Sequence, residues 1–129
     1  MQRVNQPVCP FCNLPKERVL LETETTLAFF DGYPVTEGHA LVIPKRHVAS
    51  IFELPPEELA ALWTKVAVVR KLLKERYDPD AFNIGVNDGA AAGQTVPHAH
   101  IHVIPRRNGD AADPRGGVRW IIPDKAKYW

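Results

Sequence analysis

The sequence predicts an α+β domain in which an antiparallel sheet of about five strands packs against one long helix. The chain has 129 residues, a length typical of a single domain. Several short apolar segments are separated by turn residues, and only one long segment carries apolar residues at helical spacing. Strands grouped on either side of one helix, instead of alternating with helices, favour an antiparallel sheet.

The five expected strands are short and rich in β-branched or apolar residues. Three precede the helix, at 19–21, 26–30 and 39–43, and two follow it, at 82–86 and 98–104. Turn-forming residues separate them. The sequence Asp31-Gly32-Tyr33-Pro34 ends the second strand, and a loop containing glycines joins the last two.

The helix is expected to begin at Pro55-Pro56-Glu57-Glu58, because proline and acidic residues suit a first turn. Asp78-Pro79 ends it. Between these limits the apolar residues recur at helical spacing: Leu59, Leu62, Trp63, Val66, Val69, Leu72 and Leu73. This apolar stripe is wide, so we expect one side of the helix to pack on the sheet while the rest is available for another subunit.

The composition is that of an ordinary globular protein, with 45% hydrophobic and 24% charged residues. A formal net charge of +1 argues against broad electrostatic binding to nucleic acid, although a small nucleotide needs only a few placed groups. No apolar stretch approaches the roughly 20 residues of a membrane span. The first seven residues lack the apolar run of a secretory signal, so a cytoplasmic protein is expected, with no nucleic acid or membrane as partner.

The five histidines fall into two groups, His39 and His47, then His98, His100 and His102. The second group alternates, and alternate residues of a strand share one face. Ala99, Ile101 and Val103 would then point into the core. The preceding loop, 89–95, is made largely of small residues that would let a ligand approach its backbone amides.

Three interpretations of this alternation compete. The histidines can be surface residues without a role, although strict alternation by chance is the weakest explanation. They can bind a metal, as in three-histidine zinc enzymes, but roughly 6–7 Å between neighbours on one strand face is wide for ligands of a single ion. They can also serve nucleophilic catalysis, in which a neutral imidazole attacks an electrophile while its neighbours assist.

Cys9 and Cys12, the only cysteines, form a C-x-x-C pair. In a reducing compartment, metal ligands or plain thiols are favoured over a disulfide. A redox motif would normally follow a βαβ pattern, and the sequence predicts none. Two thiolates and two imidazoles would make an ordinary tetrahedral zinc site.

The segment 87–106 resembles the signature of the histidine triad (HIT) superfamily, His-φ-His-φ-His-φ-φ, where φ is apolar. His98-Ala99-His100-Ile101-His102-Val103-Ile104 fits each position. A second block, 28–31 followed by 38–47, is also similar, and the two blocks lie in the family's order with its helix between them. The resemblance covers residues 9–106 of one domain, 1–129, and leaves the tail, 107–129, without a match.

The resemblance implies that His100 attacks the α-phosphorus of a nucleotide and forms a nucleotidyl-histidine intermediate, which water or another acceptor resolves. His98 and His102 would bind phosphate oxygens, His102 would also assist the leaving group, and His39 would support the cluster. The implied nucleotide-binding residues are Asp31 at the ribose, Asn87, Gln94 and Thr95 at the phosphate or leaving group, and Phe11, Leu14, Phe29 and Phe30 around the base. Because Phe29 and Phe30 alternate on a strand, at least one of them is expected to be core.

The resemblance also implies a structural zinc ion, bound by Cys9, Cys12, His47 and His98, and no organic cofactor. The zinc would tie the N-terminal loop, 1–18, to the catalytic strand. If zinc takes the ring of His98, that ring cannot also bind phosphate.

The implied function is that of a nucleotide hydrolase or nucleotidyl transferase. It would act on a phosphoramidate, an acyl nucleotide or a dinucleoside polyphosphate with a purine base. The alternative is a nucleotide-binding regulatory module with negligible turnover. Related uridylyltransferases carry glutamine at the position of His102, which weakens the assignment of this chain to them. A DNA-repair hydrolase would call for a basic surface.

The resemblance also implies a homodimer formed through the helix and an edge strand, with Trp120, Tyr128 and Trp129 near the partner's site. The competing expectation is a monomer whose tail closes its own core.

Overall fold

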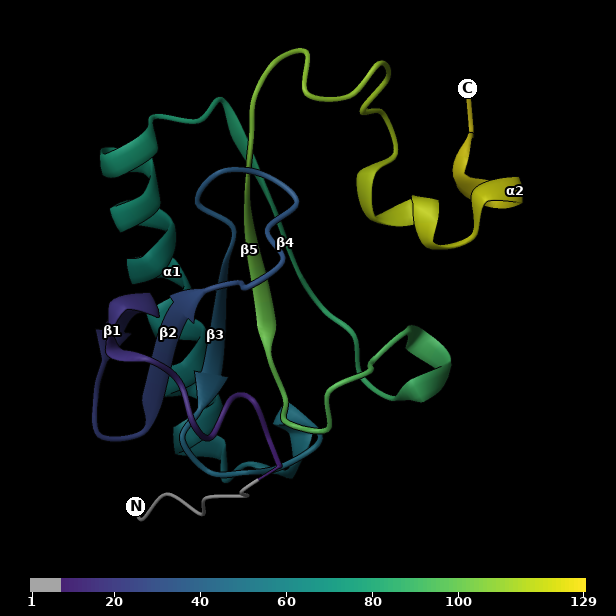
Figure 1. The fold of residues 1–129 in the computed structure, drawn as a ribbon. Helices are drawn as coiled ribbons and strands as arrows, with labels where there is room; N and C mark the ends of the chain where they lie inside the picture. The colour runs from purple at the N-terminus through teal and green to yellow at the C-terminus, as the bar shows by residue number, and fades with distance from the viewer. Residues whose placement is uncertain (1–7) are drawn as a thin grey trace.

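The computed structural model describes residues 8–129 and shows one twisted sheet with a long helix on one face (Figure 1). The strands are β1 (Val19–Glu22), β2 (Thr26–Phe30), β3 (Ala40–Pro44), β4 (Ala81–Val86) and β5 (Ile101–Arg106), and the helix is α1 (Pro56–Tyr77). The order across the sheet is β1-β2-β3-β5-β4, with every neighbouring pair antiparallel. The expected α+β class, with about five strands and one long helix, is therefore confirmed.

The two faces of the sheet carry different residues. The face toward α1 is apolar and packs on the buried side of the helix: Ala28, Ala40, Val42, Ile101 and Val103 from the strands, and Leu62, Val66, Val69 and Leu73 from α1. On the other face, Phe29 and Leu41 pack against Phe11 and the two cysteines of the N-terminal segment. The sheet thus lies between α1 and the N-terminal segment.

The helix has the predicted ends. Proline occupies its first position, Glu57 and Glu58 lie in its first turn, and Asp78 ends it in the left-handed conformation, with φ 47°. The Asp78 N–H donates to the Lys74 carbonyl, and the Lys74 ammonium contacts the Asp78 carboxylate at 2.8 Å. These contacts fix the point at which the chain turns back toward β4.

The last strand differs from its predicted range, because β5 begins at Ile101 and not at His98. Its ladders with β3 and β4 both start at Ile101, so His98, Ala99 and His100 have no paired strand beside them. The Ala99 N–H donates instead to the Val48 carbonyl at 2.7 Å. Ala99 is nevertheless buried with Ile101 and Val103 against α1, so the expected alternation of the core holds.

Two leucines of α1 provide a test of this packing. Leu62 is 1% exposed and Leu72 is 37% exposed. We expect Leu62→Ala to lower the free energy of unfolding by about 2–5 kcal/mol, because the change leaves a cavity between α1 and the sheet. Leu72→Ala, the same change on the outer face, should cost less than about 1 kcal/mol. Urea denaturation measures both, and equal losses would contradict the packing.

The chain beyond β5 forms a small hook beside the β4 side of the sheet (Figure 1). It contains η4 (Gly117–Ile121) and α2 (Pro123–Ala126). Hydrogen bonds within the tail stabilise it: the Arg119 guanidinium donates to the Ala126 carbonyl at 2.8 Å, and the Trp120 indole N–H donates to the Arg115 carbonyl.

Among the described residues, no helix has the length and apolar character needed to cross a membrane.

Candidate active site and metal centre

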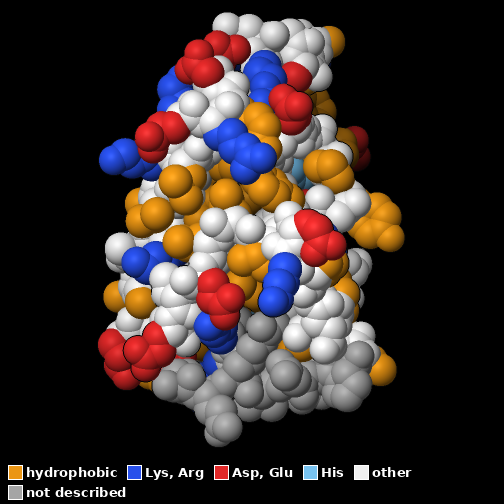
Figure 2. Space-filling view, turned by 60° about the vertical axis from the view of Figure 1, so that its left-hand side comes forward, with side chains coloured by type: hydrophobic (Ala, Val, Ile, Leu, Met, Phe, Trp, Pro, Cys, Tyr) orange, Lys and Arg blue, Asp and Glu red, His pale blue; other side chains and the backbone are white. Residues whose placement is uncertain are grey.

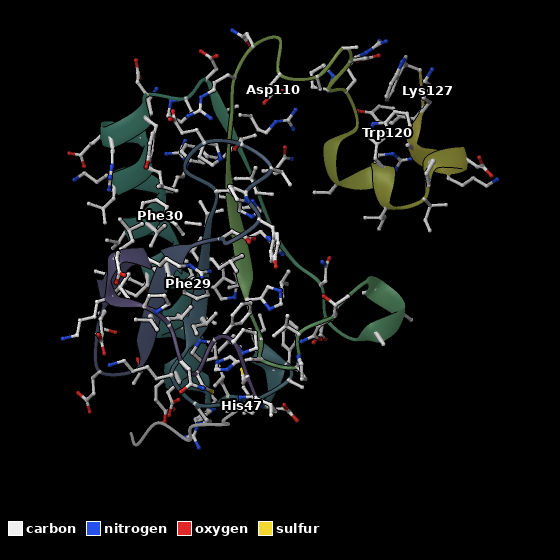
Figure 3. The ribbon with its side chains drawn as sticks, viewed as in Figure 1. Phe29, Phe30, His47, Asp110, Trp120 and Lys127 are labelled. Atoms are coloured by element: carbon white, nitrogen blue, oxygen red, sulfur yellow. The ribbon has the colours of Figure 1, made fainter. Side chains whose placement is uncertain are left out.

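Two cysteines and two histidines from three separate segments converge at one end of the sheet. Cys9 and Cys12 lie in a turn closed by the Cys12 N–H donating to the Cys9 carbonyl, His47 follows β3, and His98 precedes β5. Their ligand atoms all lie within 4.8 Å of one another. Figure 3 shows His47 at the end of the molecule where the N-terminal segment lies.

The distances in this cluster fit a tetrahedral metal ion. A zinc site with Zn–S bonds of about 2.3 Å and Zn–N bonds of about 2.0 Å separates its S and N atoms by roughly 3.5 Å. The Cys12 Sγ lies 3.4 Å from His47 Nδ1 and 3.6 Å from His98 Nδ1, and the Cys9 Sγ lies 3.6 Å from His98 Nδ1. The donor set of two thiols and two imidazoles is one that zinc prefers, so these four residues fit the ion.

The surroundings of His98 support the same conclusion. The ring is fully buried, and its Nε2–H donates to the Pro44 carbonyl at 2.9 Å. The lone pair of its Nδ1 therefore points into the cluster, 3.1 Å from Nδ1 of His47. Burial also raises the pKa of the Cys9 thiol. A bound cation would stabilise the thiolate and separate the facing nitrogen lone pairs.

His100 has a defined tautomer. It lies in the segment before β5, and its Nδ1–H donates to the His98 carbonyl at 2.8 Å. In a neutral imidazole this hydrogen bond leaves the lone pair on Nε2. The ring is mostly buried, and its centroid lies 5.0 Å from that of Phe11 and 5.2 Å from that of His102. A preoriented imidazole of this kind is suited to act as a nucleophile.

His39 and His102 form a directional chain of hydrogen bonds. The Val35 N–H donates to His39 Nδ1 at 3.1 Å, so the hydrogen of a neutral His39 is on Nε2. That Nε2–H donates to His102 Nδ1 at 2.9 Å, which places the hydrogen of His102 on its Nε2. The carboxylate of Asp31 lies 3.4 Å from the same Nε2 of His39. Although the three side chains are close enough to suggest a metal site, His39 presents a hydrogen there and no lone pair.

A hollow of about 640 Å³ opens beside this chain. His39, His102 and Asn87 line it together with Ala91, Ala92 and Gly93, which belong to or follow η3 (Ala90–Ala92). The tail residues Val118, Ile121 and Ile122 also line it. Its volume lies in the range of small-molecule sites, and its wall combines apolar side chains with a few polar groups.

The apolar residues expected around the base separate between the two faces of the sheet. Phe11 and Phe29 are in contact, with centroids 5.2 Å apart, and Leu14 packs on the same cluster. Phe30, its neighbour on β2, lies on the opposite face against Tyr77 of α1. Phe30 thus does not share a face with Phe11 and Phe29, because successive residues of a strand point to opposite faces.

The three residues expected near the phosphate also differ in their positions. Asn87 lines the hollow, and Thr95 is exposed in the loop before His98. The side chain of Gln94 accepts from the Gly89 N–H at 2.9 Å and donates to the Ala49 and Val96 carbonyls. Gln94 thus holds the shape of the loop with its own polar atoms.

Backbone groups complete the site, and their roles could not be predicted from the residue types in the sequence. The Val35 N–H sets the tautomer of His39, while the Pro44 and His98 carbonyls orient His98 and His100. A main-chain amide or carbonyl is present at almost every position, so sequence alone does not distinguish these. The tail side chains beside the hollow were missed because they follow no periodic pattern.

The burial of His102 predicts a pH dependence of stability. Burial lowers the pKa of His102 to about 4, and the charges of His100 and His39 act in the same direction while Asp31 opposes them. An unfolded histidine titrates near 6.5, so between about pH 6.5 and 4 the unfolded chain binds more protons. Stability should therefore fall as the pH is lowered through this range.

The test is urea denaturation of the wild type and His102→Asn at pH 7 and pH 5. The loss of unfolding free energy on acidification should be smaller in the variant, which lacks this titrating group, and one proton contributes at most about 1.4 kcal/mol per pH unit. An identical loss in both proteins would contradict the assignment to His102.

The fold and the two clusters define a class of protein: an α+β domain that presents a histidine chain beside a Cys₂His₂ group. The family model of the HIT domain matches residues 14–109. The chain therefore belongs to the HIT family.

Several relatives carry names that describe hydrolases. The bis(5'-nucleosyl)-tetraphosphatase [asymmetrical] of Schizosaccharomyces pombe is 42% identical over 96 residues, which cover 74% of this chain and 53% of that protein. The adenylylsulfatase HINT3 of Arabidopsis thaliana is 39% identical over 106 residues, covering 79% and 54%. The chain thus spans about half the length of these curated relatives.

A solved structure resembles the chain in both fold and sequence. The Zn-bound histidine triad family protein of Mycobacterium smegmatis aligns with a TM-score of 0.68 and 42% identity, covering 74% of this chain and 69% of that one. Zinc is thus present in a family member of closely similar fold.

Proposed function

We propose that this protein is a nucleotide hydrolase or nucleotidyl transferase that attacks the α-phosphate of a nucleoside phosphate derivative. The observation that carries the proposal is the hydrogen bond from His100 Nδ1–H to the His98 carbonyl, which leaves Nε2 as the nucleophilic atom. The names of the relatives support hydrolysis of a nucleotide substrate.

In the proposed reaction, the Nε2 lone pair of His100 forms a bond to the α-phosphorus while the bond to the leaving group breaks. His102 donates its Nε2–H to the departing atom or to a phosphate oxygen. The anionic phosphate favours the protonated form of His102 and so opposes the burial that lowers its pKa. Water, or another acceptor, then attacks the phosphorus and gives its proton to Nε2 of His102, while the bond between phosphorus and His100 Nε2 breaks and returns the electron pair to His100.

The remaining side chains bind and orient the nucleotide. Phe11 and Leu14 provide an apolar surface for the base, for which we propose a purine, and the fully buried Phe29 supports Phe11 from behind. Asp31 accepts hydrogen bonds from the ribose hydroxyls. Asn87 and Thr95 contact the phosphate or the leaving group, while Gln94 shapes the loop. His39 fixes the tautomer of His102.

The proposed metal is zinc, held by Cys9, Cys12, His47 and His98. It would neutralise the two buried thiolates and crosslink three segments of the chain, and no chemical step uses it. Because the ring of His98 belongs to this cluster, His98 contributes to nucleotide chemistry only through its carbonyl.

The test is turnover of two substrates, an adenosine phosphoramidate and a diadenosine polyphosphate, with release of AMP followed by chromatography. Turnover of either one supports the proposal, and their kcat/KM ratio identifies the preferred leaving group. Tight AMP binding without turnover of either substrate would overturn it in favour of a nucleotide-binding regulatory module.

We also propose that the chain forms a homodimer through the side of α1 that carries Trp63 and through the edge strand β4. Trp63 is exposed on α1, on the side where the Arg70 guanidinium lies over the Phe82 ring of β4, and β4 lies at one edge of the sheet. Figure 2 turns the side that carries α1 forward and shows hydrophobic side chains gathered among charged ones. A two-fold interface would cover both the apolar face and the unpaired strand edge.

Sedimentation equilibrium at micromolar concentration tests the assembly. A mass of twice the chain mass is expected, and Trp63→Glu should shift the equilibrium toward the monomer because it places a charge in the interface. A wild-type mass equal to that of one chain would contradict the dimer. Deleting 120–129 would show separately whether the tail supports assembly or only activity.

A further inference from the structure

We infer that the Cys₂His₂ cluster positions the nucleophile His100, acting through His98 and through Phe11, so that metal binding sets the tautomer and the packing of His100. The inference rests on the proposed function, because it assigns to the metal a role in preparing the nucleophile for that reaction. It concerns the free protein and requires no metal chemistry during turnover.

The first link is the residue His98, which belongs to both groups. Its ring Nδ1 lies in the cluster, 3.6 Å from the Sγ of Cys9 and of Cys12, while its carbonyl accepts the Nδ1–H of His100 at 2.8 Å. The direction of that carbonyl therefore depends on how the His98 ring is held. The segment of His98, Ala99 and His100 precedes β5 and has no strand ladder of its own, so the ring contacts of His98 matter more than they would inside the sheet.

The second link is Phe11, which lies between the two cysteines in the sequence. The turn that brings Cys9 and Cys12 together directs the Phe11 ring against two other rings. Its centroid lies 5.0 Å from that of His100, at an interplanar angle of 81°, and 5.2 Å from that of Phe29. Phe11 is mostly buried, as is His100. A metal that fixes both cysteines would therefore also fix one wall around the His100 ring.

The two links together predict what loss of the metal does. Without a cation, two thiols and two imidazoles replace four metal bonds by weaker hydrogen bonds, and the N-terminal turn is released from His47 and His98. The His98 carbonyl and the Phe11 ring then lose their fixed positions. His100 would turn to the Nε2–H tautomer that unconstrained imidazoles prefer, and its nucleophilic lone pair would no longer be on Nε2.

The direct experiment is ¹⁵N–¹H NMR of the full chain labelled at histidine, loaded with Zn²⁺ or stripped by a chelator under reducing conditions. His100→Ala identifies the His100 signals. With Zn²⁺, we expect His100 to carry its hydrogen on Nδ1; without it, we expect the Nε2–H form to dominate and kcat to fall by about tenfold or more. The same Nδ1–H tautomer in folded protein with and without Zn²⁺ would overturn the inference.

The Phe11 variants test the second link while the metal stays bound. Phe11→Ala should keep the zinc content of the wild type, remove the aromatic ring-current shift from the His100 protons and raise KM severalfold. Phe11→Tyr, which keeps the ring, should restore both. If the protein unfolds when zinc is removed, the Phe11 variants provide the test of the inference. Unchanged His100 signals and an unchanged KM in Phe11→Ala would overturn it.

This outcome is separable from the failure of the proposed function. The tautomer is measured without substrate, so a metal-dependent tautomer in a protein without turnover would reject only the proposed function.

Discussion

Replacing His100 with alanine is expected to lower kcat by at least about a thousandfold, because the proposed reaction has no other nucleophile in position. The Nδ1–H of His100 is bound to the His98 carbonyl, which leaves Nε2 available for attack. AMP affinity should change little, since most of the proposed contacts to base and ribose come from other residues. Steady-state kinetics and calorimetric AMP titration measure the two effects.

Comparison with His102→Asn separates the nucleophile from its assistant. Loss of His102 should reduce kcat by about 10²–10⁴, the usual range for a general acid, and the reduction should be smaller for a substrate with a better leaving group. Rapid quenching followed by intact-mass analysis should detect a nucleotide bound to the wild type and none bound to His100→Ala. Wild-type kcat in His100→Ala would reject the mechanism.

Removing the metal is expected to have the largest effect on stability. We expect purified protein to contain about one zinc ion per chain and to melt at least about 10 °C lower after chelation, because the ion would crosslink three segments of the chain. The Sγ of Cys12 lies within 3.6 Å of the Nδ1 atoms of both His47 and His98, so Cys12→Ser should reproduce the loss. Elemental analysis and calorimetry provide the measurements.

Adding back zinc supplies the control for this prediction. It should restore the melting temperature of the chelated wild type but not that of Cys12→Ser. A metal-free preparation that melts at the same temperature as the zinc-loaded protein would contradict the site, as would a disulfide between Cys9 and Cys12 in protein isolated under reducing conditions.

The sequence predicted the elements whose pattern is local. The end residues of α1 follow from Pro56 and Asp78, and the core face of β5 follows from alternation. The Cys₂His₂ cluster was also predictable, because a C-x-x-C pair and the family resemblance identified its four members before the structure brought their ligand atoms together.

The features that the sequence did not predict depend on contacts between distant segments. The position at which β5 begins depends on where β3 and β4 can pair with it. The residue types at His98 and His100 do not indicate that position. The side on which Phe30 lies follows from the placement of α1. The hydrogen bonds between Gln94 and the backbone of Gly89, Ala49 and Val96 are likewise revealed only by the folded loop.

The alternation of β5 has a consequence for how such a chain can evolve. Ile101 and Val103 face α1, while His102 lies between them on the other face. Inserting or deleting a single residue within this strand would exchange the two sets, so that one length change would place an imidazole in the core and an isoleucine beside His39. Substitutions can accumulate here one position at a time, but the length of the strand must stay fixed. The side chains of the loop around Gly89 do not alternate between two faces, so a change in its length exchanges no buried and exposed residues. Variation in length between family members should therefore be concentrated in this loop.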